Sequence, residues 1–223
     1  MSLPDSRLLT EQNTLAAMAP ADLAPHLLAH LPHAEESAKR NVELSGPAVS
    51  TVARELGGLL ASSQVPGTPK MNRVMMLRHV AASWSTALAP FSACRKRCSH
   101  CCHIAVTIPE TEAKLIAKKT GRPLHKPLRP RTLADGSDLE QPYGYDHPCI
   151  FLKDGGCSIY EHRPLACRVL VNMDDTDLLC RLQPGKVVPV PYANSSAIQG
   201  RFALVTQNDV FADIRDWFRN QTP

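Results

Sequence analysis

The sequence predicts a mainly α protein with irregular loops, in which a small metal-stabilised cysteine-cluster domain is flanked by helices. Helical apolar spacing dominates the first third of the chain, and all eight cysteines come after residue 93. The 223 residues include 19 prolines but only 5 Phe, 2 Trp and 4 Tyr. We therefore expect bound metal, rather than a large aromatic core, to organise the cysteine-rich part.

The composition excludes several classes of protein. A hydrophobic fraction of 43% with 21% charged residues is typical of a globular chain and argues against a disordered or fibrous one. No apolar run approaches the roughly 18 residues that a membrane span needs. The start MSLPDSRLLTEQ has an acidic residue where a signal peptide would be basic and then apolar. We expect a cytoplasmic protein with reduced thiols and no membrane partner.

Residues 1–66 form an N-terminal helical segment in this interpretation. Short Ala- and Leu-rich helices are expected over 8–18 and 23–31, and Ser45-Gly46-Pro47 should open a longer helix that ends near residue 60. After the linker around Pro66 and Gly67, Thr68 is the expected N-cap of a helix over 69–88, with Pro69 at its first position. The Met-rich stripe of that helix is interpreted as core packing.

Residues 67–183 form the predicted cysteine-cluster domain. A helix over 109–120 is expected from a capping box of Thr107 and Glu110, and Gly121 should end it. The Pro- and Gly-rich residues 122–145 predict a long loop, and only short elements are expected over 147–170.

Residues 184–223 form a predicted C-terminal loop and amphipathic helix. The helix is expected over 195–220, and we interpret its apolar stripe as packing onto the domain. The stripe consists of Val210, Phe211, Ile214, Trp217 and Phe218.

The cysteines are the candidate metal ligands. Thiolates are soft ligands that favour zinc, iron–sulfur clusters or copper(I) over calcium and magnesium. They divide into two four-sulfur sites, or into one full cluster and a smaller site, with Cys101 and Cys102 facing different ones because neighbouring side chains point apart. The candidate ligands are Cys94, Cys98, Cys101, Cys102, Cys149, Cys157, Cys167 and Cys180.

Zinc and an iron–sulfur cluster both fit this spacing. Zinc sites use cysteines separated by two to four residues, as in the pairs formed by Cys98 with Cys94 and with Cys101. A close cysteine triplet with a remote Pro-Cys ligand, here Pro148-Cys149, is typical of iron–sulfur clusters such as 4Fe–4S, which we favour slightly. Between residues 94 and 131 ten Lys and Arg face two Glu. This positive charge could neutralise thiolates or bind phosphates.

The role of each of the other polar residues near the cysteines has two interpretations. His100, His103 and His147 could be ligands, but with eight thiols available we expect them to support the ligands or to be exposed. Arg163 and Arg168 could donate hydrogen bonds to thiolates or pair with Glu161 or Asp154.

The order and spacing of these motifs resemble a known family. The run C-x3-C-x2-CC is followed by Pro148-Cys149-Ile-Phe-Leu, by Cys157-Ser-Ile-Tyr and by Arg163-Pro-Leu-Ala-Cys167-Arg168. This pattern is similar to the YkgJ-type cysteine-cluster proteins, described as a zinc- or iron-chelating domain. The resemblance covers residues 94–180 and implies metal chelation by the first seven cysteines, while Cys180 lies where the pattern is looser. A longer relative, the flagellin lysine N-methylase, carries a similar domain.

We therefore expect a protein that chelates metal through clustered thiolates. An enzyme is the first alternative, either lysine N-methylase-like or dependent on S-adenosylmethionine, although only 122 residues follow Cys101 and they hold too few strand–helix alternations for the barrel of the latter class. A zinc-dependent nucleic-acid-binding module is the second. The sequence identifies neither a substrate, nor a protein partner, nor catalytic residues.

Overall fold

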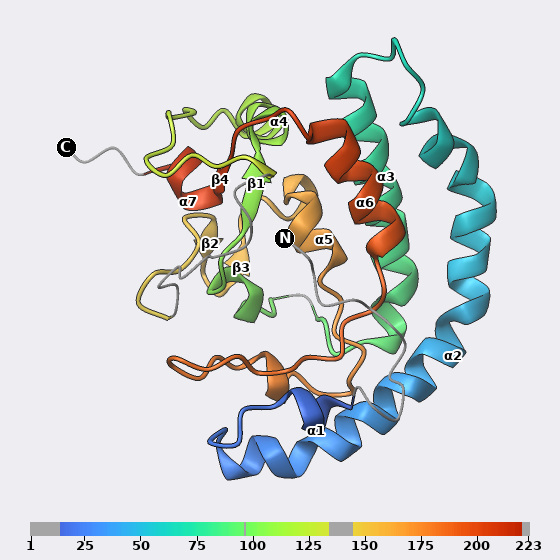
Figure 1. Cartoon of the computed structure of the whole chain (residues 1–223), viewed down its shortest axis with the longest axis vertical. Helices are drawn as coiled ribbons and strands as arrows, with labels where there is room; N and C mark the ends of the chain where they lie inside the picture. The colour runs from blue at the N-terminus through green and yellow to red at the C-terminus, as the bar shows by residue number, and fades with distance from the viewer. Residues whose placement is uncertain (1–13, 96, 134–144, 220–223) are drawn as a thin grey trace.

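The computed structural model describes residues 14–95, 97–133 and 145–219, and it confirms a mainly α protein in which helices flank a cysteine-rich centre (Figure 1). The strands form two small two-stranded antiparallel sheets, β1 with β4 and β2 with β3. The α-helices are α1 (Leu15–Met18), α2 (Pro25–Ser62), α3 (Lys70–Leu88), α4 (Glu110–Thr120), α5 (Leu165–Val169), α6 (Ser196–Thr206) and α7 (Ile214–Trp217). The strands are β1 (Thr107–Pro109), β2 (Leu152–Lys153), β3 (Gly156–Cys157) and β4 (Phe211–Asp213). Short 3-10 turns are η1 (Ala89–Phe91), η2 (His100–Cys102), η4 (Tyr160–His162) and η5 (Leu178–Cys180).

The long helix α2 corrects the prediction of separate helices over 23–31 and 45–60. It runs through both Pro32 and Pro47, which remove hydrogen-bond donors without ending the helix. The helix curves around the outside of α3 in Figure 1, and such bending is the usual response to internal proline. Of the helix expected over 8–18, the structure shows α1, while residues 1–13 lie outside the described part.

Helix α3 confirms the predicted helix that leads into the cysteines. Its N-cap is Pro69, one residue later than the expected Thr68. Val74, Leu77 and Trp84 are buried on its inner face, whereas Met75 is 46% exposed and does not join the core. The chain then passes through η1 directly to Cys94.

The start of α4 corrects the predicted capping box. Thr107 lies in β1 opposite Asp213, so its side chain does not cap the helix, whose N-cap is Pro109. The C-terminal tail supplies the caps instead, because the Glu110 N–H donates to the Val210 carbonyl and the Thr111 N–H donates to Asp209 at 3.0 Å. Gly121 ends the helix as predicted, with a left-handed φ of 69°.

The tail is not the single helix expected over 195–220. Helix α6 ends at Thr206, and β4 and α7 follow because the tail pairs with β1 and Asp213 caps α7 through the Arg215 N–H at 2.8 Å. The predicted packing of the apolar stripe is confirmed for Ile214, Trp217 and Phe218, which are at most 3% exposed, whereas Val210 is 37% exposed. The described residues 122–133 are irregular, as expected for the loop, and 134–144 lie outside the described part.

Three apolar clusters form the interior. The first joins α2, α3, α5 and α6, and the second joins β1, β4, α4 and α7 with Phe151 and several cysteines. The third packs α1 and the start of α2 against Leu179. The first cluster contains residues from before position 66, from 67–183 and from after position 183. The domain boundaries expected at these two positions stay predictions.

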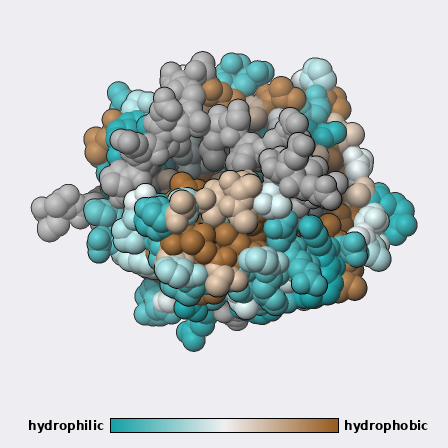
Figure 2. Space-filling model, turned by 60° about the horizontal axis from the view of Figure 1, so that its bottom comes forward, coloured by the Kyte–Doolittle hydropathy of each residue, from teal (hydrophilic) through white to brown (hydrophobic). Residues whose placement is uncertain are grey.

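The surface shows two further features. The side that carries α1 comes forward in Figure 2, where apolar side chains gather within a hydrophilic surround. Met18 on this helix is 49% exposed. Among the described residues, no helix combines the length and the apolar character that crossing a membrane requires.

Candidate metal centre

All eight cysteines are free thiols, and separate segments of the chain carry them into the middle of the fold. Cys94 follows η1, and Cys98 comes next in a turn closed by its own N–H to the Arg95 carbonyl at 3.0 Å. Cys101 and Cys102 lie in η2, Cys149 precedes β2, Cys157 ends β3, Cys167 lies in α5 and Cys180 ends η5. The predicted ligands therefore come from five separate segments of the chain.

One group, which we call the first thiol set, consists of Cys94, Cys98, Cys101 and Cys180. These four side chains line a single cavity of about 270 Å³, together with apolar residues from 179–190. Burial raises the pKa of Cys180 to about 12, although the Asn172 side-chain amide donates to its Sγ at 3.3 Å. Burial also raises the pKa of Cys94 and Cys98, with the neighbouring Cys101 adding to the effect.

A histidine and a carboxylate lie at the edge of the first thiol set. Donor atoms of Cys98, His100 and Asp177 lie within 4.8 Å of one another, and the Nε2 of His100 is 3.2 Å from Asp177 Oδ2. A carboxylate that holds a histidine in this way is common beside metal ions. The sequence analysis missed Asp177, although an acidic run of Asp174, Asp175 and Asp177 just before Cys180 could have drawn attention to it.

The second thiol set consists of Cys102, Cys149, Cys157 and Cys167, which lie in or against the second apolar cluster. Cys102 and Cys149 are buried, and the Cys149 N–H donates to the Cys102 carbonyl at 2.7 Å. Burial raises the pKa of Cys149 to about 11, and burial together with neighbouring thiols raises that of Cys167 well above its ordinary value. This set packs with Phe151, Ile108 and Trp217, and the Arg215 guanidinium donates to the Cys102 carbonyl at 3.0 Å.

Cys101 and Cys102 connect the two sets. The Cys102 thiol donates a hydrogen bond to Cys101, which lowers the pKa of Cys101 to about 7 and raises that of Cys102. Cys101 lines the cavity of the first set while Cys102 lies in the apolar cluster of the second. The adjacent thiols thus lie in different surroundings.

The remaining histidines lie at the margin. His103 contacts the ring of Tyr145, with centroids 4.8 Å apart, and His147 is exposed while its carbonyl accepts from Arg215. His100 is the histidine that joins a thiol and a carboxylate in a possible ligand group.

The structure corrects both predictions for Arg168, a hydrogen bond to a thiolate and an ion pair with a carboxylate. Its guanidinium donates to the backbone carbonyls of Arg163 and Glu161, at 3.0 and 2.6 Å, and not to a thiol or a carboxylate. Arg163 lies over the Tyr160 ring at 4.3 Å, and its Nε is buried without a hydrogen-bond partner in the described part of the chain. Burial raises the pKa of Cys157, and the positive charges of Arg163 and Arg168 oppose that rise.

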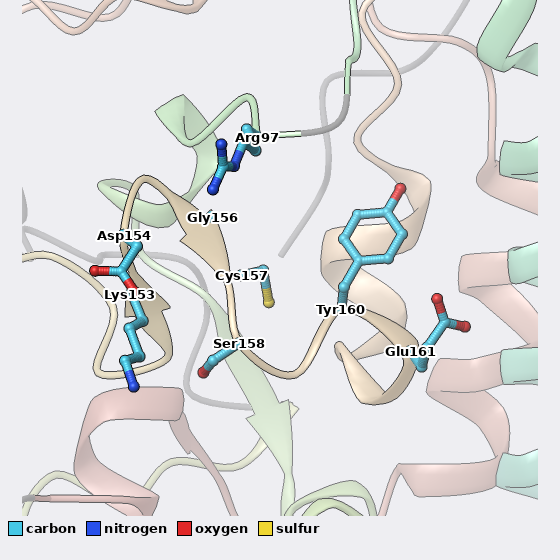
Figure 3. A pocket seen from close by; sticks show the side chains of 8 residues that line it. All are labelled: Arg97, Lys153, Asp154, Gly156, Cys157, Ser158, Tyr160 and Glu161. Atoms are coloured by element: carbon cyan, nitrogen blue, oxygen red, sulfur yellow. The ribbon is translucent and has the colours of Figure 1, made fainter.

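An open pocket of about 640 Å³ reaches the second thiol set from outside. Its lining includes Arg97, Lys153, Cys157, Tyr160 and Glu161. In Figure 3, Arg97 lies on one side of Cys157 and Tyr160 on the other. The second set therefore has one thiol at a solvent-accessible pocket.

Comparison with known proteins finds one matching family. Residues 93–184 match the family model described as "CxxCxxCC: Putative zinc- or iron-chelating domain". The match contains all eight cysteines and confirms the resemblance to the cysteine-cluster family. Residues 93–184 thus correspond to the cysteine-cluster domain that this family model describes. No curated protein and no solved structure matches the chain.

Proposed function

We propose that the protein binds metal at two centres, one in each thiol set, and that the first set holds an iron–sulfur cluster. The observation that carries the proposal is the gathering of eight free thiols, from five separate segments, into one region of the fold. Free cysteines are usually inert core residues when they occur singly. Eight thiols together are better explained as metal ligands. Burial raises the pKa of several of these thiols, and nearby arginine charges oppose that rise.

The cavity of the first set favours a cluster over a single zinc ion. Four thiolates around one zinc ion at about 2.3 Å stand roughly 3.8 Å apart. The thiols of the first set instead border a cavity of about 270 Å³, which has room for a larger group. A four-iron cluster takes one thiolate on each iron, and such clusters carry single electrons at potentials tuned by nearby hydrogen bonds.

The surrounding residues suit a thiolate-bound group. Four thiolates carry four negative charges, and Arg163 lies close enough to favour the charged form of Cys94 and Cys101 against the effect of burial. The Asn172 amide donates to the Sγ of Cys180, as side chains around cluster sulfurs do. The residues of this chain would thus orient the ligands, neutralise their charge and exclude water.

Zinc in the first set is the second candidate, and the trio of Cys98, His100 and Asp177 favours it. Mixed sulfur, nitrogen and oxygen donors within 4.8 Å suit one small ion better than a cluster. The enzymatic alternative that uses S-adenosylmethionine has less support, because the described residues form two-stranded sheets rather than a barrel. Nothing in the described residues favours nucleic acid over the neutralisation of thiolates.

Metal and sulfide analysis of the full chain, purified without oxygen, tests the proposal. We expect iron and acid-labile sulfide in stoichiometric amounts, with a charge-transfer absorption that oxygen bleaches. Stoichiometric zinc without sulfide would show that the first set binds zinc, the second candidate, and not an iron–sulfur cluster. A folded protein that contains neither element above background would overturn metal binding altogether.

A further inference from the structure

We propose that the pocket at Cys157 is the port through which metal enters and leaves the second thiol set, and that it receives metal as a small anionic thiolate or carboxylate complex. This inference rests on the proposed function, because a port requires a centre behind it. The pocket volume of about 640 Å³ lies within the range of small-molecule sites.

Cys157 is the accessible member of its set. Cys102 and Cys149 are only 8% and 9% exposed, and Cys167, which is half-buried like Cys157, does not line the pocket. Cys157 is half-buried and lines the pocket. An incoming complex therefore meets Cys157 before the other three thiols.

The hairpin of β2 and β3 fixes the position of Cys157. Cys157 pairs with Leu152, and Lys153 pairs with Gly156, which leaves Asp154-Gly155 as a two-residue turn. Both turn residues have positive φ, 50° and 72°, as a type I′ turn requires. The thiol and Lys153 are thus held on one short, well-defined element.

Two cationic side chains in the lining of the pocket are available to an anionic ligand. The side chains of Arg97 and Lys153 make no hydrogen bond or ion pair with any residue in the described ranges. The left-handed backbone at Arg97, φ 72°, carries its side chain over the hairpin, where a Cβ on Gly156 would lie 3.9 Å from its Cγ. Figure 3 shows Arg97 beside Gly156 and Cys157. Glu161 and Asp154 also line the pocket, so its charge is mixed, and Arg97 and Lys153 are the two cations among its lining residues.

Metal transfer at this port is a ligand exchange without redox chemistry. A metal–sulfur bond to Cys157 forms as one metal–ligand bond of the carrier breaks. The proton of the Cys157 thiol passes to the leaving thiolate or carboxylate. The other three thiols then replace the remaining carrier ligands in the same way.

The test follows metal release from the loaded protein with two chelators, anionic EDTA and neutral 1,10-phenanthroline. An alkylating agent in the mixture labels thiols as they are freed, and peptide mass spectrometry separates Cys157 and Cys149 from the first set. We expect Arg97→Gln to slow EDTA-driven labelling of the second set by about three- to tenfold, and phenanthroline-driven labelling little. The matched control is Arg54→Gln, an exposed arginine on α2.

The outcomes separate this inference from the proposed function. If EDTA-driven labelling of the second set had the same rate in Arg97→Gln, Arg54→Gln and the parent protein, the proposed port would be wrong, even with metal at both centres. Equal slowing with both chelators would also overturn it, because the effect would then be structural rather than electrostatic. The absence of metal in the purified protein would overturn the proposed function and the port together.

Discussion

The two thiol sets differ in what holds them. The first set lies among polar contacts, with His100, Asp177 and Asn172 around its sulfurs. The second set lies in an apolar core with Phe151 and Trp217, both nearly inaccessible to solvent. An apolar core keeps its shape through close packing, whereas a hydrogen-bonded loop depends on every partner. The first set should therefore depend more on bound metal for its geometry.

The loop that carries Cys180 also binds helix α2. Asp174 is fully buried and accepts hydrogen bonds from Ser37 at 2.9 Å and from His30 at 2.7 Å. The Asn41 amide donates to the Met173 carbonyl at 2.8 Å. The first set is thereby linked to the first half of α2, whereas the second set makes its main contacts with the C-terminal tail.

The largest expected effect comes from removing one ligand of either set. Cys98→Ser should lose metal and most of the structure of residues 94–180, because structural metal sites contribute about 10–16 kcal/mol while whole domains are stable by about 5–15 kcal/mol. Cys167→Ser should also lose metal but retain more of its structure, because the second set lies in an apolar core. Cys180→Ser should resemble Cys98→Ser, since both thiols line one cavity. Metal content and thermal unfolding measure these effects. If Cys98→Ser unfolded at the same temperature as the parent protein, the thiols would be core residues and not metal ligands.

A buried ion pair between the two regions gives the next largest effect. Glu112 on α4 is fully buried and binds Arg78 on α3 at 2.6 Å and the Leu165 N–H at 2.7 Å. Glu112→Gln leaves Arg78 buried without its counter-charge, which should lower the free energy of unfolding by about 3–5 kcal/mol. Denaturant unfolding provides the measurement.

The neighbouring Glu110→Gln is the matched control for this change. Glu110 pairs with Lys114 at 2.8 Å on the exposed side of the same helix, and such pairs contribute less than about 1 kcal/mol. If both variants lost equal stability, the ion pair would not join the two regions in the way that we infer.

Local sequence signals predicted those parts of the fold that depend on local chemistry. The apolar period of α3 and the glycine that ends α4 were visible because neighbouring residues determine them. The capping box failed because Thr107 pairs with Asp213, more than 100 residues away, and the single tail helix failed for the same reason. Pro47 suggested a helix start, but packing of α2 on α3 carried the helix through it.

The candidate site was predictable to a similar degree. Cysteine spacing identified the ligands, because metal chemistry restricts which residues cluster. It did not show which cysteines share a set, since that depends on how distant loops meet. Asp177 and the roles of Arg163 and Arg168 were missed for the same reason, because their partners are set by tertiary contacts.

An effect of intermediate size is expected in hydrogen exchange, measured before and after metal removal, which compares the regions around the two thiol sets. We expect residues 94–180 to lose protection, the last turns of α3 to follow because they lead into Cys94, and residues 49–60 to change little. Residues 30–41 should show a partial loss, since His30, Ser37 and Asn41 bind the Cys180 loop. Uniform loss along the whole chain would indicate one cooperative unit and contradict a domain boundary near residue 66.

The smallest expected effect concerns Asp175, which binds α2 at the surface. Hydrogen bonds from Asn41 and Arg40 lower the pKa of its carboxyl below the ordinary 3.8. The stabilisation is therefore present above about pH 4 and is lost as the pH falls through the lowered value. Because the side chain is 42% exposed, Asp175→Asn should cost less than about 1 kcal/mol at neutral pH and reduce the loss of stability in acid. Glu55→Gln, exposed on the other half of α2, is the control for thermal unfolding between pH 7 and pH 3. An identical acid profile for Asp175→Asn and the parent would show that this contact does not help to hold α2 against the Cys180 loop.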